Sequence, residues 1–413
     1  MGYPAASARA FQYGLVIFTL TALLGLANAT QLFGALDRNT LLTHLHSGTL
    51  GWITMGVIGI SIWMFGGSGS TAARNVMLSA LATAAYVLAF WSGNFQARAI
   101  FGTIELLVIF YWWWFVVSRG LAEGFGRLDI PKLSVIFGLT TLVIGSTIGV
   151  TVQIILGTGN QLPTNTDLVG GHASAQVGGY LVLVAAGFAE WRLTGGGKRS
   201  AAGIAQVALL FVGGLLLAVS LLLASVLGPQ LSQALPGIAT LLTILGIVIV
   251  AVRFGRSALA APWRSASGIR HVAIAVGFLV LGVILEAILV QQFIAAQGDQ
   301  SKVSVGLLHA LDHTMFVGLM TNMLFGAILV GAAADRPRAW PWADQVVFWG
   351  LNIGVAGFVA TLLIAGSGEG AKPFTNPVSF IAPIMGLSAL LGIATFSMRL
   401  SNAPEPMRAP SPA

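Results

Sequence analysis

The sequence has no cysteine among its 413 residues. This absence excludes disulfide bonds, thiolate metal sites, iron–sulfur clusters and covalent attachment of a c-type haem. Any metal that the chain binds must therefore be held mainly by histidine or carboxylate side chains. Histidine is itself scarce, with six residues in the whole chain.

Charged residues are also scarce, at 8% of the sequence, whereas hydrophobic residues make up 56% and the mean hydropathy is +0.88. A soluble domain carries about 25% charged residues, so this chain lacks the polar surface needed to face water. A nucleic-acid-binding protein would need a basic face on a soluble module, and no such module is present. The sequence therefore predicts a lipid bilayer as the partner and no nucleic acid.

Twelve long apolar runs cover most of the chain. Each is long enough for a bilayer core, which needs roughly 20 helical residues, and in lipid the backbone must bond within each segment. We therefore predict an all-α polytopic membrane protein with one transmembrane domain, 1–413, and no sizeable soluble part. The predicted spans are 11–33, 41–66, 72–95, 99–121, 132–157, 168–189, 201–226, 232–252, 269–296, 303–333, 343–366 and 376–398.

Basic residues are distributed unevenly between the two sides of these spans. All but four of the 20 lysines and arginines fall at the termini or in the even-numbered connections. The exceptions are Arg38, Arg98, Lys302 and Lys372. Because positive charge accumulates on the cytoplasmic side, we predict that both termini are cytoplasmic and that the chain is a multi-pass protein of the cell's inner (cytoplasmic) membrane.

Five of the six histidines are predicted to share one depth in the membrane. They are His44 and His46 in the second span, His172 in the sixth, and His309 and His313 in the tenth. At about 1.5 Å per residue, all five lie roughly 5–15 Å below the outer interface. The sixth, His271, begins the ninth span and is expected to be an interfacial residue at the cytoplasmic rim.

The histidine-bearing spans lie four spans apart, and two of them share a sequence pattern. His46 is followed by Ser47, Gly51, Thr54 and Gly59, and His313 by Thr314, Gly318, Thr321 and Gly326, at the same offsets. The stretch GGHASAQVGGYLVLVAAG around His172 is a looser relative. We predict three repeats of four helices, at about 1–121, 132–252 and 269–398. The alternative is chance similarity between glycine-rich membrane helices, in which small residues are common.

The spacing of the histidines limits which of them can share a ligand. His44 and His46 point about 200° apart on a helix, so one helix could serve two sites. His309 and His313 lie on nearly the same face, and His172 and Gln176 repeat that geometry. A buried histidine could simply hydrogen-bond to a neighbouring helix, but five at one depth favour a metal site. Imidazole suits iron, copper or zinc, and a helical bundle can form the apolar slot that a porphyrin needs.

Three carboxylates also lie within the spans: Glu105, Glu286 and Asp312. They could carry protons to a buried site or orient a ligating histidine by a hydrogen bond. Asp312 can do the latter only if its side chain turns towards His309. The alternative is a neutral acid bonded to a backbone carbonyl, a state that burial favours.

The segment HLHSGTLGW at 44–52 resembles the ligand helix of cbb-type haem-copper oxidases. It is also similar to the His-x-His pattern of NnrS-type membrane proteins, which are linked to nitric oxide tolerance. In the haem-copper superfamily twelve helices form a pseudo-three-fold ring, and helices 2, 6 and 10 carry metal ligands. The layout here is similar across essentially the whole chain. The resemblance implies that His46 and His313 are the ligands of a low-spin haem and that His172 corresponds to a copper ligand.

The sequence departs from the oxidase pattern at three places. The span 201–226 has no histidine where the oxidases have a pair, the tenth span has His-x-x-x-His, and Gln176 replaces the tyrosine expected after His172. The resemblance therefore implies a haem-binding redox protein with an incomplete copper site. His46 and His313 would hold a b-type haem, and His44, His309 and His172 would supply a second haem or copper. An enzyme of this kind would be an oxidoreductase acting on oxygen or nitric oxide, with a quinol or cytochrome donor and partner subunits.

Two other functions remain open from the sequence. One is a non-catalytic haem- or metal-binding protein of the nitric oxide response. The other is a secondary transporter that uses histidine and glutamate side chains as a proton relay. No catalytic residue is assigned by the sequence.

Overall fold

A computed structural model describes residues 3–67, 69–164, 166–196, 199–297, 300–367 and 372–402. Within these ranges the chain contains twelve helical segments that are long and apolar enough to cross a membrane. This confirms the predicted all-α membrane architecture and the number of spans.

Most spans consist of one continuous helix. These are α1 (Ala5–Thr30), α4 (Ser70–Trp91), α5 (Phe95–Glu123), α6 (Ile130–Gly157), α9 (Ala201–Leu222), α10 (Ala224–Leu259), α11 (Gly268–Ala295), α14 (Ala343–Ala365) and α15 (Val378–Ser401). In α10 the backbone leaves the helical conformation at Gly228 (φ 74°, ψ 164°), so the crossing segment is Gln230–Leu259. A short 3-10 turn, η3 (Gln300–Lys302), precedes the tenth span.

The second, sixth and tenth spans are composite, because each contains π-helical turns. The second consists of α2 (Arg38–His46), η1 (Ser47–Thr54) and α3 (Met55–Phe65). The sixth consists of α7 (Leu168–Ser174), η2 (Ala175–Leu181) and α8 (Val182–Thr194). The tenth consists of α12 (Val305–His313), η4 (Thr314–Thr321), α13 (Asn322–Ala327) and η5 (Ile328–Ala332). Because π-helical turns widen a helix and often mark functional sites, these spans are where a site is expected.

Each composite span begins at a side chain that caps its first turn. Asp37 accepts hydrogen bonds from Asn39 N and Thr40 N, Asp167 accepts one from Gly170 N, and Ser304 accepts one from Leu307 N. The hydrogen bonds from Thr40, together with that from Asn39, lower the pKa of Asp37, which keeps this cap negative at the positive end of the helix. These caps fix where the helices start, so the histidines lie within their first three turns.

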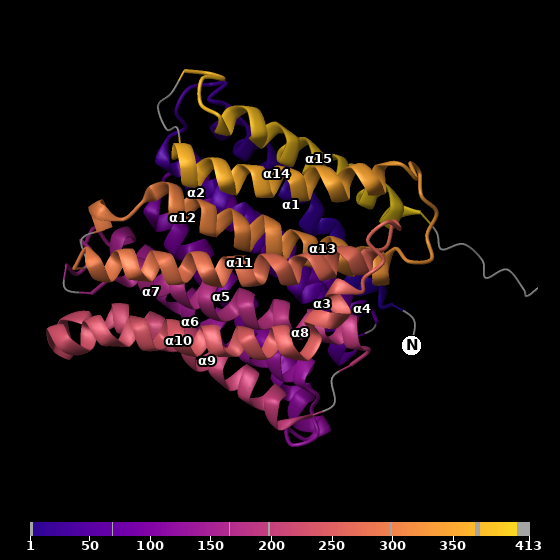
Figure 1. Cartoon of the computed structure of the whole chain (residues 1–413), viewed down its shortest axis with the longest axis horizontal. Helices are drawn as coiled ribbons and strands as arrows, with labels where there is room; N and C mark the ends of the chain where they lie inside the picture. Colours follow the sequence, from indigo (N-terminus) through magenta and orange to yellow (C-terminus); the bar gives the residue numbers. More distant parts are fainter. Residues whose placement is uncertain are drawn as a thin grey trace, which may run out of the picture.

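The other nine spans surround the composite ones on most sides, and α12 of the tenth span lies between α11 and α14. Neighbouring helices pack side by side, including α14 on α15, α15 on α1 and α9 on α10. Figure 1 shows these helices running alongside one another, with α14 and α15 at one edge and α9 and α10 at the other. Of the most apolar window of each span, 83% is buried in the tenth and 72% in the second, against 28% in α5. The tenth and second spans are therefore the most buried, whereas the sixth, at 56%, is buried to the same extent as α6 and α11.

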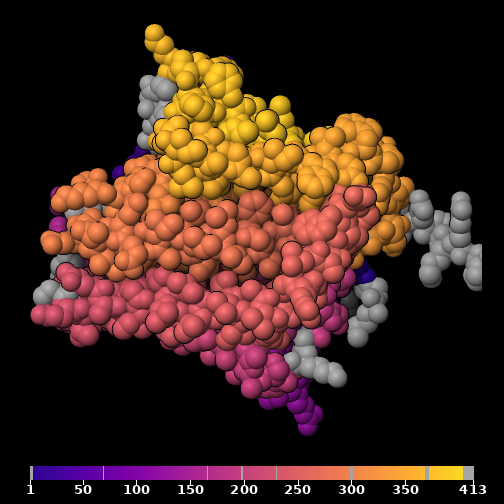
Figure 2. Space-filling view, viewed as in Figure 1, coloured from indigo at the N-terminus to yellow at the C-terminus, as the bar shows by residue number. Residues whose placement is uncertain are grey.

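The outer face is apolar, as a lipid-facing surface requires. Figure 2 shows one such face, where α10, α11, α12 and α14 lie in adjoining bands. Exposed side chains on these helices include Val252, Ile284, Ile353 and Ile364. In a bilayer these residues meet acyl chains rather than water.

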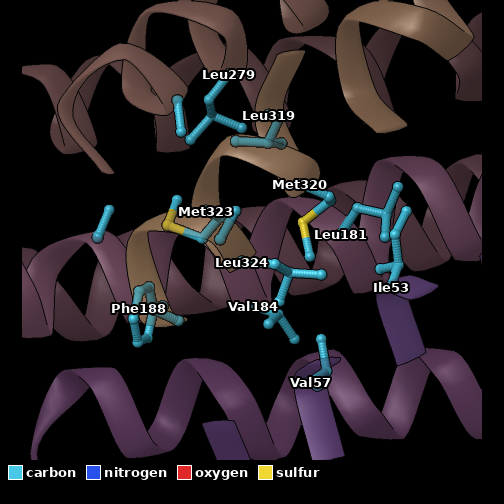
Figure 3. Packing of buried hydrophobic residues seen from close by; sticks show 14 of the residues in the cluster. Ile53, Val57, Leu181, Val184, Phe188, Leu279, Leu319, Met320, Met323 and Leu324 are labelled. Atoms are coloured by element: carbon cyan, nitrogen blue, oxygen red, sulfur yellow. The ribbon is translucent and has the colours of Figure 1, made fainter. Parts of the chain in front are cut away.

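The hydrophobic core lies where the three composite spans meet. Ile53 and Val57 come from the second span, Leu181 and Val184 from the sixth, and Leu324 from the tenth, and all are almost fully buried. Figure 3 shows these side chains facing one another together with Leu319, Met320 and Met323. Packing of these apolar side chains therefore holds the three composite spans at a fixed separation.

Each composite span packs on the helix that precedes it through a glycine at a corresponding position. Gly59, Gly187 and Gly326 lie at the same distance along the chain from the start of η1, η2 and η4. A Cβ atom at these positions would lie 3.2, 2.9 and 3.0 Å from a backbone oxygen of α1, α6 and α11. Those oxygens belong to Ser7, Pro131 and Gly268. The three pairs thus share one register, which is the pattern that three-fold repetition produces.

We expect Gly326→Ala to destabilise the fold by about 1–3 kcal/mol, because a Cβ atom there would lie 2.7 Å from Val272 Cγ2. Thermal unfolding of the purified protein in detergent measures the effect. Gly277→Ala on α11 is the matched control, since its Cβ atom would meet no atom within 4 Å. Equal melting temperatures for the two variants would contradict close packing at Gly326.

Candidate functional site

Five histidines lie at one end of the bundle, where α2, α7 and α12 begin, which we call the histidine end. His271 starts α11 at the opposite end. It is 0% exposed, its Nδ1 lies 2.9 Å from Asn322 Oδ1, and its ring meets Phe348 edge to face. His271 thus lies in the first turn of its span, as expected of a residue near the rim, but its side chain is packed between helices.

Four of the five histidines at this end are oriented by a hydrogen bond from Nδ1 to a backbone carbonyl. The pairs are His44 with Thr21 O at 2.9 Å, His46 with Leu42 O at 2.8 Å, His172 with Gly145 O at 2.7 Å, and His313 with His309 O at 2.8 Å. A carbonyl only accepts hydrogen bonds, so Nδ1 must carry the proton. The lone pair of each neutral ring is therefore on Nε2, as a metal ligand requires.

A cavity of about 330 Å³ lies at this end between α1, α2, η1, α12, η4, α14 and α15. Its lining includes His44 from one side and His309, Asp312 and His313 from the other. His313 is within electrostatic reach of both His44 and His309. The cavity therefore brings together imidazoles from the second and the tenth spans, which we call the first histidine pair, His44 and His313.

His46 does not line this cavity and faces the other side of its helix. Its ring stacks on Phe90 of α4 at 3.7 Å and meets Tyr86 edge to face at 6.2 Å. It is within electrostatic reach of His172 of the sixth span. We call His46 and His172 the second histidine pair. The opposite orientations of His44 and His46 agree with the 200° expected from their spacing.

The structure thus places His313 and His44 at the first cavity, whereas the sequence predicts His46 as the partner of His313. The positions of these residues relative to the π-helical segments are informative. His46 and His313 both stand one residue before a π-helical segment, at Ser47 and Thr314. Of these two residues at corresponding positions, His313 lines the first cavity and His46 does not. His44 and His172 are likewise equivalent, since each stands three residues before η1 or η2.

The surroundings of the two pairs repeat as well. The ring of His44 lies over Gly25 of α1 and that of His172 over Gly149 of α6. A Cβ atom at either glycine would lie 2.8 Å from the Cε1 atom of the histidine. His46 contacts Phe90 of α4, and His313 contacts Phe358 of α14 at 4.7 Å. The two pairs are therefore built alike.

A third pair of positions, between the sixth and tenth spans, corresponds to the two histidine pairs but contains no histidine. Leu311 stands three residues before η4, and Ser174 stands one residue before η2. Gly25 follows Ser7 on α1 by the same number of residues as Gly149 follows Pro131 on α6. Glu286 follows Gly268 on α11 by that number too, so it occupies the corresponding position. Its Oε1 lies 2.9 Å from where a Cβ atom of Gly178 would be. The structure therefore places Glu286 in the third position and against the sixth span.

The other predicted polar residues are distributed among these positions. Glu105 accepts a hydrogen bond from Thr83 at 3.0 Å and acts electrostatically on Tyr86, which contacts His46. Gln176 donates to Ser146 on α6 at 3.2 Å, so it lies on the same face of its span as His172. Asp312 lines the first cavity next to His313.

Two arginines near the histidine pairs were not recognised from the sequence. Arg38 lies exposed and lines the first cavity. Arg98, at the start of α5, is only 2% exposed and lies over the ring of Phe90 at 4.8 Å. Both belong to the four basic residues that depart from the charge asymmetry of the connections. That departure is the signal that could have identified them.

Imidazoles from two different spans line this largely apolar cavity, and imidazole nitrogen is a ligand that suits haem iron, copper or zinc. Among the residues that the structure describes, no three histidine, aspartate or glutamate side chains converge to hold a bare metal ion.

The second and tenth spans are also joined directly beside the site. Trp52 Nε1 donates to Thr321 Oγ1 at 3.0 Å, and both residues line the first cavity. Thr321 in turn donates to Phe316 O within its own π-helical segment at 3.0 Å. This bond fixes the distance between the helices that carry His44 and His313.

We expect Thr321→Val to destabilise the protein by about 1–3 kcal/mol, because the buried indole N–H of Trp52 loses its acceptor. Thermal unfolding in detergent provides the measurement. Thr103→Val is the control, since Thr103 is exposed and bonds only to Ala99 O of its own helix. A Thr321 variant as stable as the Thr103 variant would show that the bond between the spans contributes nothing.

Comparisons with known proteins show the fold. No family model matches the chain, and neither does any curated protein. Among solved structures the chain is similar to a haem-copper terminal oxidase dimer determined by cryo-electron microscopy. The similarity covers 97% of this chain and 85% of the oxidase chain, with a TM-score of 0.71 and 11% sequence identity. The chain therefore has the fold of a haem-copper oxidase membrane subunit.

Proposed function

We propose that this protein is an integral membrane haem protein in which His44 and His313 are the axial ligands of a b-type haem. The observation that carries this proposal is the pair itself. The two imidazoles face one cavity from different spans, and each has its Nδ1 committed to a carbonyl and its Nε2 available. The oxidase-like fold supports a related redox function.

The cavity suits a porphyrin in its lining. Phe18, Trp52 and Phe316 provide aromatic walls, and Leu26 and Met385 add aliphatic surface. Arg38 lies exposed at the start of α2, where it can pair with a propionate. Bound ligands commonly occupy pockets of this kind, which are mainly apolar with a few polar groups that fix orientation.

A haem with two imidazole ligands supplies reversible one-electron transfer. The protein's part is to hold both rings, and the carbonyls of Thr21 and His309 do so by accepting the Nδ1 protons. Such bonds also make the ligating nitrogen more basic. Helices α1, α14 and α15 form much of the wall of the cavity. We infer a membrane redox protein, with electron transfer as its basic reaction.

A complete haem-copper centre is not part of this proposal, because α9 (Ala201–Leu222) contributes no histidine. Reaction with oxygen or nitric oxide would instead need His44 or His313 to leave the iron. His309 gives that alternative some support, since it lines the same cavity and could replace His313. Carbon monoxide binding to the reduced protein tests it, because only an open iron binds the gas.

The remaining features of the proposal concern the cellular setting. We place the protein in the cytoplasmic membrane with both termini inside, on the basis of the charge asymmetry of the connections. A quinol or a cytochrome is the proposed electron donor. Partner subunits are also proposed, by analogy with oxidases of the same fold.

We expect His44→Gln to remove the low-spin haem held by the first pair. Loss of an axial ligand should lower haem affinity by at least the roughly 10–100-fold that results from losing a hydrogen-bonding partner of a ligand. Oxidised and reduced absorption spectra of the purified protein measure the effect, together with haem content per chain. The control is Leu241→Gln on α10, an exposed residue away from the cavity.

Two results would contradict the proposal. A colourless wild-type protein without iron would exclude a haem function and favour a secondary transporter with a histidine and glutamate proton relay. A low-spin spectrum that is unchanged in His44→Gln but lost in His46→Gln would return the assignment to His46 and His313.

A further inference from the structure

We propose that the second histidine pair, His46 and His172, holds a second haem between the second and sixth spans. This inference rests on the proposed function in one respect only, that the protein binds haem. The site it names shares no ligand with the first pair, so the two can be tested separately.

The first argument is that the two pairs present the same ligand atoms. His46 and His172 both bind a backbone carbonyl through Nδ1, at 2.8 and 2.7 Å. Their Nε2 atoms therefore carry the lone pairs, as in the first pair. The two side chains come from spans that meet farther along the membrane, where Tyr180 OH lies 3.4 Å from Thr54 Oγ1. Both are partly exposed although they lie inside the bundle, so open space reaches them.

The second argument is that the supporting residues are repeated too. Gly149 lets the ring of His172 lie against α6, as Gly25 does for His44 on α1. A phenylalanine also packs on one histidine of each pair: Phe90 stacks on His46 at 3.7 Å, and Phe358 meets His313 at a tilt at 4.7 Å. A side chain at either glycine would displace the imidazole, so both helices keep room for a ring in one orientation.

The third argument comes from Arg98. This guanidinium is almost fully buried in the first turn of α5, next to Phe90. Its hydrogen-bond partners in the described part of the chain are neutral: Asn39 Oδ1 at 2.7 Å, Phe90 O at 2.8 Å and Ala89 O at 3.5 Å. A buried cation in a membrane normally has an anionic partner or marks a function. A haem propionate beside His46 would supply that anion.

The third equivalent position shows that the fold does not need these histidines for packing. There Leu311 replaces the residue equivalent to His172, and Ser174 replaces the one equivalent to His46. The helices still meet in the same register through Gly326 and Gly268. If the histidines served only helix packing, we would expect them at all three pairs of positions. They occur instead as two full pairs and are absent from the third, which is the distribution that two ligand sites would produce.

The experiment compares haem content and low-spin signal in four forms of the full-length protein purified from a haem-replete host. These are wild type, His172→Gln, His44→Gln and the double variant. Haem per chain is measured by the pyridine haemochrome method, and low-spin ferric haem by electron paramagnetic resonance. We expect two haems in wild type. Each single variant should lose half of the low-spin signal, and the double variant should lose all of it.

Ala173→Gln is the matched control, because Ala173 is exposed and adjacent to His172 on α7. It should retain both haems. Elution as a single species in size-exclusion chromatography shows that each variant is folded. Gly149→Ala provides a second test that keeps the ligand, because its Cβ atom would lie 2.8 Å from both Cε1 and Nδ1 of His172. It should weaken the second haem selectively.

One haem per chain, lost in His44→Gln and unchanged in His172→Gln, would overturn the second site while leaving the proposed function intact. Copper bound at His46 and His172 without a second haem would also overturn it. A folded His172→Gln protein that retains the full low-spin signal would do the same.

Discussion

Hydrogen bonding of imidazole in an apolar medium is the constraint on which the rest of the structure depends. Inside a bundle a histidine must satisfy Nδ1–H or bear the cost of an unpaired donor. His44, His46, His172 and His313 all satisfy it with a backbone carbonyl. Backbone acceptors do not titrate and barely move, so the tautomer and the ring orientation are set by the helices themselves. Each ligand position is thereby tied to the packing of two spans.

That packing is controlled by small residues at repeated places. The rings of His44 and His172 occupy space that a side chain at Gly25 or Gly149 would fill. Farther along, Gly59, Gly187 and Gly326 let each inner span approach the preceding helix to the contact distance of a backbone oxygen. The π-helical segments begin at corresponding residues between these two contacts. Ligand orientation and helix register are consequently parts of one interface.

Much of this architecture could be predicted from the sequence because membrane helices are specified by length and hydropathy. The twelve spans, and the opposite orientations of His44 and His46, needed no tertiary information. The arrangement of the histidines around one cavity did need it. His46 and His313 look like partners in the sequence, but the first cavity is lined by His313 and His44. The burial of His271 also needed it, because this burial depends on packing against Asn322 and Phe348 of other helices. Arg98 was missed because a basic residue near a connection is ordinarily interfacial.

Because the His-x-His segment gives one helix a ligand on each side, α2 is a wall shared by the two histidine pairs. A helix is about 10 Å across, and two unit charges at that separation interact by about 1.7 kcal/mol at an effective dielectric constant of 20. An electron placed on one side of α2 would therefore disfavour a second electron on the other. Two centres built on this helix would accept electrons one at a time, with the first at a higher potential than the second, even if their ligands and surroundings were identical.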